Sequence, residues 1–115
     1  MGVLFMANKS NILVQAVAAG GNEIIESPVI PNGKVWVIKK FGGAIPNLGD
    51  NYSGNVVLRF GTTILRVLTL CGSSQEIQLN SEVTGNGSDK LNVVLQNPST
   101  NAKDIVFWYD AYERE

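Results

Sequence analysis

Short segments rich in Val, Ile, Leu and aromatic residues alternate along the chain with clusters of Gly, Asn and Ser. This pattern is typical of many short strands joined by turns. It predicts strands over residues 11–18, 23–27, 34–41, 55–60, 63–71, 75–81, 91–96 and 103–112. The clearest is 75–81, where Ile77 and Leu79 alternate with polar residues as in a half-buried strand. No stretch combines a sustained helical period with caps at both ends.

The number and spacing of these strands predict the fold class. We expect an all-β, two-sheet antiparallel sandwich that is jelly-roll-like and has about eight strands. An immunoglobulin-like sandwich is the second choice, because its paired cysteines and core Trp are absent. With 115 residues the chain suits one ordinary domain. We assign residues 11–115 to a single β-sandwich domain and residues 1–10 to an N-terminal arm or leader.

Alternation within two of the strands predicts which side chains face the core. In 34–41 it places Val35, Val37 and Phe41 on one face, and Trp36 and Ile38 on the other. Both faces of that strand are therefore apolar, and we expect it to be covered on two sides.

The last strand, 103–112, presents two different faces. The aliphatic-rich set is expected to line the core: Ile105, Phe107, Tyr109 and Ala111. That choice leaves Trp108 and Tyr112 for an outer surface, where exposed aromatic rings favour a partner interface or a sugar-stacking platform. The alternative is a strand buried on both faces. The same two alternatives, an outer surface or a buried position, apply to Trp36.

Charge and residue counts exclude several classes of function. Nine basic and ten acidic residues give a net charge of -1, so no polycationic surface exists to bind nucleic acid or an anionic membrane. The chain has no His and a single Cys, Cys71. The common general base, the histidine-paired nucleophiles and a multi-cysteine zinc site are therefore missing. We predict no catalytic residue, no metal and no cofactor, and a protein that is not an enzyme.

Three weaker signals have plain structural interpretations. A glycoside hydrolase needs two carboxylates held across one bond, and the fold could assemble such a pair from Glu76 and Asp110. The simpler interpretation is that both are solvated surface charges. The polar segment with Asn47, Asp50 and Asn51 offers oxygen ligands for calcium without the EF-hand spacing, and we expect an ordinary loop. The Gly-rich range 85–88 is expected to be a hairpin loop, and Cys71 a buried, inert thiol.

The apolar N-terminus allows two interpretations. Val3, Leu4 and Phe5 form part of a short apolar run with no basic segment before it and no cleavage-type site soon after, so we do not expect a signal peptide here. These residues either form an arm that packs on a neighbouring subunit, or belong to a leader before a start at Met6.

Two segments carry a resemblance to a known family: residues 29–38 (VIPNGKVWVI) and the Gly-rich loop leading into residues 91–97 (LNVVLQN). With these segments the chain resembles the small jelly-roll decoration, or cement, proteins of tailed bacteriophage capsids. The resemblance implies a homotrimer that binds the major capsid protein. It also implies synthesis in the host cytoplasm and a final location on the capsid surface of the virion.

These observations lead to one functional hypothesis and one alternative. We expect a non-catalytic virion structural protein, a capsid decoration protein that stabilises the outer shell through subunit contacts. The alternative is a glycan- or receptor-binding module such as a phage fibre knob, with a host-surface glycan as partner and stacking by Trp36, Tyr52, Trp108 or Tyr112. The interface candidates are Val3, Leu4, Phe5, Trp36, Trp108 and Tyr112.

Overall fold

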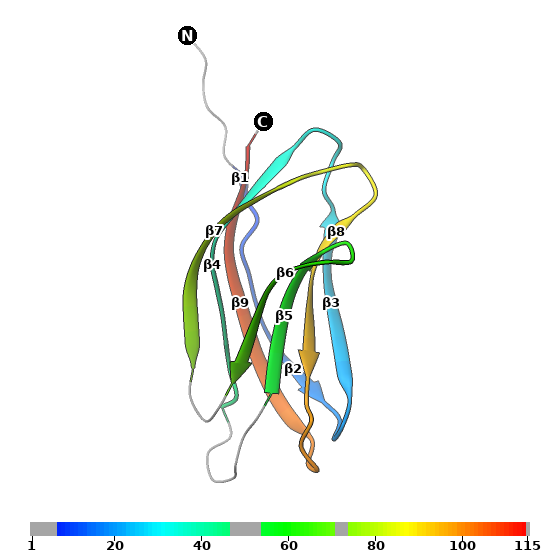
Figure 1. Cartoon of the computed structure of the whole chain (residues 1–115), viewed down its shortest axis with the longest axis vertical. Coiled ribbons are helices and arrows are strands. Elements are labelled where there is room, and N and C mark those ends of the chain that lie inside the picture. Colours follow the sequence, from blue (N-terminus) through cyan, green and yellow to red (C-terminus); the bar gives the residue numbers. More distant parts are fainter. Residues whose placement is uncertain (1–6, 47–53, 71–73, 115) are drawn as a thin grey trace.

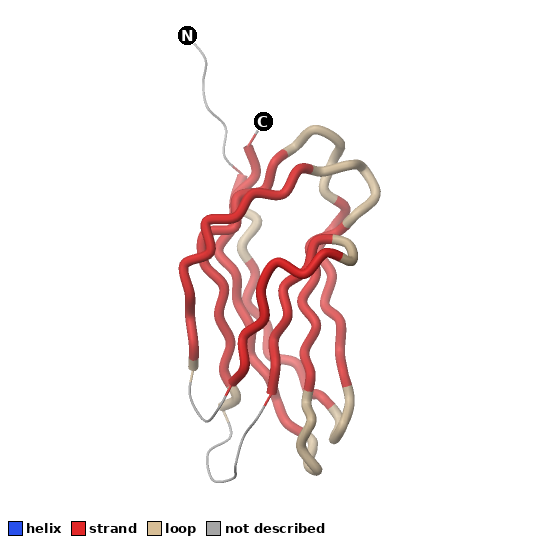
Figure 2. Tube along the Cα trace, in the orientation of Figure 1, coloured by secondary structure: helices blue, strands red, loops and turns tan. Residues whose placement is uncertain are grey.

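The computed structural model describes residues 7–46, 54–70 and 74–114, whose regular elements are all strands (Figure 2). In this part of the chain no helix is long and apolar enough to cross a membrane. The strands are β1 (Ala7–Asn8), β2 (Asn11–Val17), β3 (Asn22–Val29), β4 (Val35–Ala44), β5 (Gly54–Phe60), β6 (Thr63–Leu70), β7 (Gln75–Thr84), β8 (Lys90–Gln96) and β9 (Lys103–Arg114). The predicted all-β fold is confirmed.

The strands form two antiparallel sheets that pack face to face (Figure 1). Sheet A has the order β2-β9-β4-β7, with β1 also pairing with β9, and sheet B has the order β3-β8-β5-β6. The chain therefore pairs β2 with β9, β3 with β8, β4 with β7 and β5 with β6, as one long antiparallel ribbon rolled into a sandwich. That arrangement is the predicted jelly roll.

The core lies between the two sheets and is built from alternate positions of each strand. Phe41 and Phe107 from sheet A are fully buried against Leu58 and Leu95 from sheet B. On β9 the predicted division is confirmed, because the buried positions are Ile105, Phe107, Tyr109 and Ala111. The intervening positions of β9 face outward, as an antiparallel strand with one covered face requires.

One predicted facing on β4 is wrong. Phe41 lies in the core with Trp36 and Ile38, not on the face of Val35 and Val37. The cause is a register shift between Ile38 and Lys40 in both pairings of β4. Opposite β9, the extra residue in β4 reverses the alternation of every side chain that follows it. The second sheet covers only the inner face of β4, but Val37 on the outer face is also largely buried, with 9% of its surface exposed.

The loop after β7 packs closely on the connection between β3 and β4. The Gly85 N–H donates to the Lys34 carbonyl over 2.7 Å, and the Gly33 N–H donates to the Gly85 carbonyl over 3.0 Å. A Cβ atom on Gly85 would lie 2.1 Å from the Pro31 carbonyl oxygen. This close approach of two backbones requires glycine at position 85.

The N-terminal prediction is only partly within the described residues. Ala7 and Asn8 pair with β9 as β1, so strand pairing begins inside the range 1–10. Several predicted positions lie outside the described residues, namely Val3, Leu4, Phe5, Asn47, Asp50, Asn51, Tyr52 and Cys71.

Candidate functional site

Strand β2 turns its more apolar face away from the core. Ile12 and Val14 lie opposite Trp108 and Val106 of β9, whose positions face outward. Ile12 is 69% exposed and Val14 is 58% exposed. Asn11, by contrast, lies opposite a buried position of β9 and faces inward. In a β-sandwich the more apolar face of a strand normally points toward the core.

Ile12, Val14, Val106 and Trp108 therefore form one apolar patch on the outer face of sheet A. The indole of Trp108 lies flat on the backbone of Gly42, since a Cβ there would come within 2.3 Å of the ring. Its Nε1–H donates to a Glu76 carboxylate oxygen over 2.7 Å. This hydrogen bond holds the ring against the sheet, so one face of the indole is presented outward.

The apolar patch belongs to a wider pattern of exposure. Among the described residues, the large apolar side chains that are exposed all lie on β2, β3 and β6. These three are edge strands of their sheets. Strand β7, at the other edge of sheet A, instead presents Glu76, Gln78, Asn80 and Glu82. An apolar edge is a site at which another chain can pair or pack.

The structure places the other two aromatic candidates differently. Tyr112 faces outward on β9, and the Lys39 ammonium lies 5.8 Å from its ring centroid. Trp36 is 3% exposed and belongs to the core. Its indole Nε1–H donates to a Glu113 carboxylate oxygen over 3.0 Å. Trp108 and Tyr112 thus face outward as predicted, whereas Trp36 borders a cavity at the open side of the sandwich.

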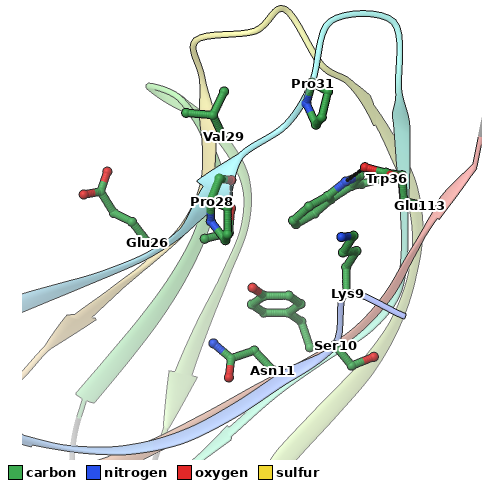
Figure 3. A pocket seen from close by; sticks show the side chains of 11 residues that line it. Lys9, Ser10, Asn11, Glu26, Pro28, Val29, Pro31, Trp36 and Glu113 are labelled. Carbon is green, nitrogen blue, oxygen red and sulfur yellow. Dashed lines mark hydrogen bonds between the residues drawn. The ribbon is translucent and has the colours of Figure 1, made fainter. Parts of the chain in front are cut away.

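That cavity has a volume of about 500 Å³ and lies between the start of β2 and the end of β3 (Figure 3). One wall is the inner face of sheet A, with Trp36 and Tyr109. The other wall is the chain that leaves sheet B, and it contains Pro28 and Pro31. Lys9 extends from the edge of sheet A toward Trp36, with Nζ 5.8 Å from the ring centroid.

Tyr109, in the wall of this cavity, has a perturbed ionisation. Burial raises the pKa of its phenol above the ordinary value of 10.0, and a hydrogen bond with the Asn11 side chain opposes that increase. Because the folded state holds the proton more tightly, the phenol contributes stability that is fully present below pH 10 and is lost as the pH rises through the raised pKa.

We therefore expect the Tyr109→Phe variant to lose less stability than the wild type between neutral pH and about pH 11. Phenylalanine preserves the ring and has no proton to lose. Urea unfolding at a series of pH values measures the difference. Parallel pH profiles for the two proteins would contradict the assignment of the alkaline loss to Tyr109.

The carboxylates considered for hydrolysis are engaged in separate contacts. Glu76 accepts from Trp108 and lies 3.9 Å from the Lys40 ammonium. Asp110 accepts from the Ser10 hydroxyl over 2.9 Å. The depression beside Trp108 is lined by Asp110 and not by Glu76. Each carboxylate therefore takes part in its own network of surface contacts.

Sequence reasoning missed both the patch and the cavity. The patch depends on which face of β2 meets the core, and only the pairing with β9 determines that. The cavity depends on Lys9 and Asn11, which fell at the boundary between the predicted arm and the predicted domain. The signal in the sequence was an alternation within one segment: the odd positions 9 and 11 are polar, and the even positions 12 and 14 are apolar.

No known protein-family model and no curated protein matches the sequence. Solved structures do match the fold. A chain from the disulfide-linked pili of Bacillus endospore appendages is similar over 98% of this chain and 91% of its own, with a TM-score of 0.63 and 14% identity. The Yersinia pseudotuberculosis-derived mitogen is similar over 90% of this chain and 86% of its own, with a TM-score of 0.59 and 8% identity.

A virus particle protein of IBDV also aligns, covering 98% of this chain and 39% of its own at 8% identity, but with a TM-score of only 0.33. That value supports no inference about a viral shell. At these identities the first two likenesses show the fold alone: a two-sheet β-sandwich.

Proposed function

We propose that the protein is a non-catalytic structural subunit that associates with other protein chains through the outer face and edge of β2. The observation that carries this proposal is the orientation of β2, whose apolar face points outward beside Trp108 and Val106. Exposed apolar residues gathered on one surface mark a contact surface. Burial of Ile12 and of Val14 in an interface would each contribute about 1.5 kcal/mol or more to the free energy of association, before the entropic cost of bringing the chains together is subtracted.

The edge of β2 is also open to pairing. It contains no charged residue and no proline, and its seven residues pair with β9 in unbroken register. Strand β3, the corresponding edge of sheet B, contains Glu23, Glu26 and Pro28 and has a register shift after Glu26. Charges, proline and bulges are the features by which proteins protect an edge from pairing. β2 has none of them.

The specific form that we propose is a capsid decoration protein of a tailed bacteriophage. In this form three copies associate at the surface of the virion and contact the major capsid protein. The resemblance of the sequence to that family supports it. The likeness to a pilus chain supports the broader idea that a sandwich of this type can be a repeated building block. A subunit that binds only the assembled shell stabilises that shell by mass action.

Val14→Lys tests the contact surface. Lysine places a charge in the middle of the apolar patch, and the monomer should tolerate it because Val14 is more than half exposed. We expect the dissociation constant for self-association to increase at least tenfold, as measured by sedimentation velocity across a dilution series. Gln78→Lys adds the same charge at an exposed position of β7 and should associate like the wild type. Unchanged association of the Val14→Lys protein would refute the role of β2.

The N-terminal arm forms a separate part of the proposal. Deleting residues 1–5, which include Val3, Leu4 and Phe5, removes apolar side chains that would pack on a neighbour. We expect weaker subunit association and weaker retention on capsids, measured by co-sedimentation. Full retention of the shortened protein would show that the segment is dispensable and favour a leader.

The alternative function, a glycan- or receptor-binding module, has one observation in its favour. Trp108 presents one face of its indole outward, held by Gly42 and Glu76. Sugar rings stack on such surfaces. Binding that is lost in Trp108→Ala while self-association persists would favour this alternative over the structural role.

A further inference from the structure

Polar and charged side chains occupy inward-facing positions at one end of sheet A. Lys9 lies opposite the buried residue Ala111, and its N–H donates to the Ala111 carbonyl over 2.9 Å. Asn11 lies opposite the buried residue Tyr109. Inner faces of a sandwich are normally filled by apolar side chains. Here Lys9 and Asn11 bring polar groups to the inner face beside Trp36 and Tyr109, where it borders the cavity of about 500 Å³.

These side chains are held in place before any ligand binds. Glu113 accepts a hydrogen bond from the Trp36 indole over 3.0 Å, and a carboxylate has capacity for further donors. Lys9 lies over the same indole. The Asn11 side chain hydrogen-bonds to Tyr109. Figure 3 shows the labelled side chains of Lys9 and Asn11 on one side of the cavity and Pro28 and Pro31 on the other. Such preorganisation lowers the entropic cost of binding.

We propose that this cavity binds a neutral saccharide. The Lys9 ammonium only donates, the Glu113 carboxylate only accepts, and the Asn11 amide does both. Sugar hydroxyls donate and accept, so they can satisfy all three groups at once. Pro28 and Pro31 provide an apolar wall for the C–H face of the ring. The volume lies within the range of small-molecule sites, which is roughly 300 to 1,000 Å³.

Charge selects a neutral sugar over the charged classes. Lys9 and Glu113 carry opposite charges, and the third charged residue of the lining, Glu26, lies 3.9 Å from the Lys90 ammonium, so the charges around the cavity largely balance. An anionic sugar would bring its carboxylate close to that of Glu113. The two carboxylates would repel each other, because the charge of Lys9 already balances that of Glu113. A cationic ligand would compete with Lys9, which already occupies the face of Trp36. The saccharide site does not depend on the proposed self-association, because Ile12 and Val14 face the opposite side of the sheet.

The two tryptophans allow a direct test by NMR. Trp36 borders the cavity and Trp108 lies on the outer face, so the chain carries one reporter and one internal control. Titration of the full-length protein with glucose, galactose, N-acetylglucosamine, cellobiose and lactose should shift the indole N–H signal of Trp36 for at least one sugar. The Trp108 signal should stay in place, and sialic acid and glucuronic acid should leave both signals unchanged. The Trp108→Phe variant assigns the two signals.

Lys9→Met and Lys39→Met form a matched pair of variants. Each removes an ammonium that lies 5.8 Å from an aromatic ring centroid, but only Lys9 borders the cavity. We expect Lys9→Met to weaken sugar binding about tenfold and Lys39→Met to leave it unchanged. Glu113→Gln keeps the shape of the side chain and should also weaken binding.

Four results would overturn the saccharide proposal. They are no Trp36 shift with any neutral sugar, a shift confined to Trp108, equal binding of the acidic sugars, and equal effects of the two lysine variants. Lys9 pointing inward can also serve to prevent edge pairing. Stronger self-association of Lys9→Met without any sugar binding by the wild type would establish that role instead.

Discussion

Replacement of Phe107 with alanine is expected to lower the free energy of unfolding by about 4 kcal/mol. Phe107 is fully buried at the centre of β9, and its ring stacks with that of Tyr109 at a centroid distance of 6.3 Å. Alanine removes the ring and leaves a cavity between two sheets that cannot close around it. Since small domains are stable by only about 5 to 15 kcal/mol, this loss is a large share of the total.

Urea unfolding followed by tryptophan fluorescence measures this effect. Phe107→Leu is the matched control, because it retains most of the buried volume and should cost about 1 kcal/mol. A Phe107→Ala protein as stable as the leucine variant would contradict the placement of Phe107 in the centre of the core.

Gly85→Ala is the second substitution with a large expected effect, about 3 kcal/mol. A Cβ at position 85 would lie 2.1 Å from the Pro31 carbonyl oxygen and 2.7 Å from the Ile30 carbonyl oxygen. Both contacts are with backbone, which cannot rotate away as a side chain can. The hydrogen bond from the Gly85 N–H to Lys34 must then lengthen as the loop moves outward.

The Thr84→Ala variant is the control for that loop. Thr84 is the neighbouring residue and is exposed, so its truncation should change the unfolding free energy by no more than about 0.5 kcal/mol. Equal stability of the Gly85→Ala and Thr84→Ala proteins would show that the loop adjusts without cost.

The fold was predictable because its signals are local. The alternation of Ile77 and Leu79 with polar residues is visible in the sequence, and the structure shows that alternation on β7. The facing of β4 was not predictable in the same way. A single extra residue near Lys39 reverses the alternation, and neither a glycine nor a proline marks the shift at that point. Phe41 consequently lies on the side opposite to its predicted one.

The candidate sites were less predictable because they depend on pairing between distant segments. Trp108 and Tyr112 could be assigned to the outer face from the composition of β9 alone. The outward orientation of Ile12 could not, because it follows from its pairing with Trp108, 96 positions further along the chain. A strand considered by itself would turn Ile12 and Val14 to the core. The same pairing turns Lys9 and Asn11 inward and produces the polar cavity.

The central claim is that β2 carries a contact surface for other copies of this chain. The most direct test is the native mass of the purified full-length protein across a dilution series. We expect an associated species that dissociates on dilution and that Val14→Lys shifts to monomer. If the protein is a capsid decoration protein, that species is a trimer. A wild-type protein that stays monomeric at every concentration, with the same mass as Val14→Lys, would contradict it.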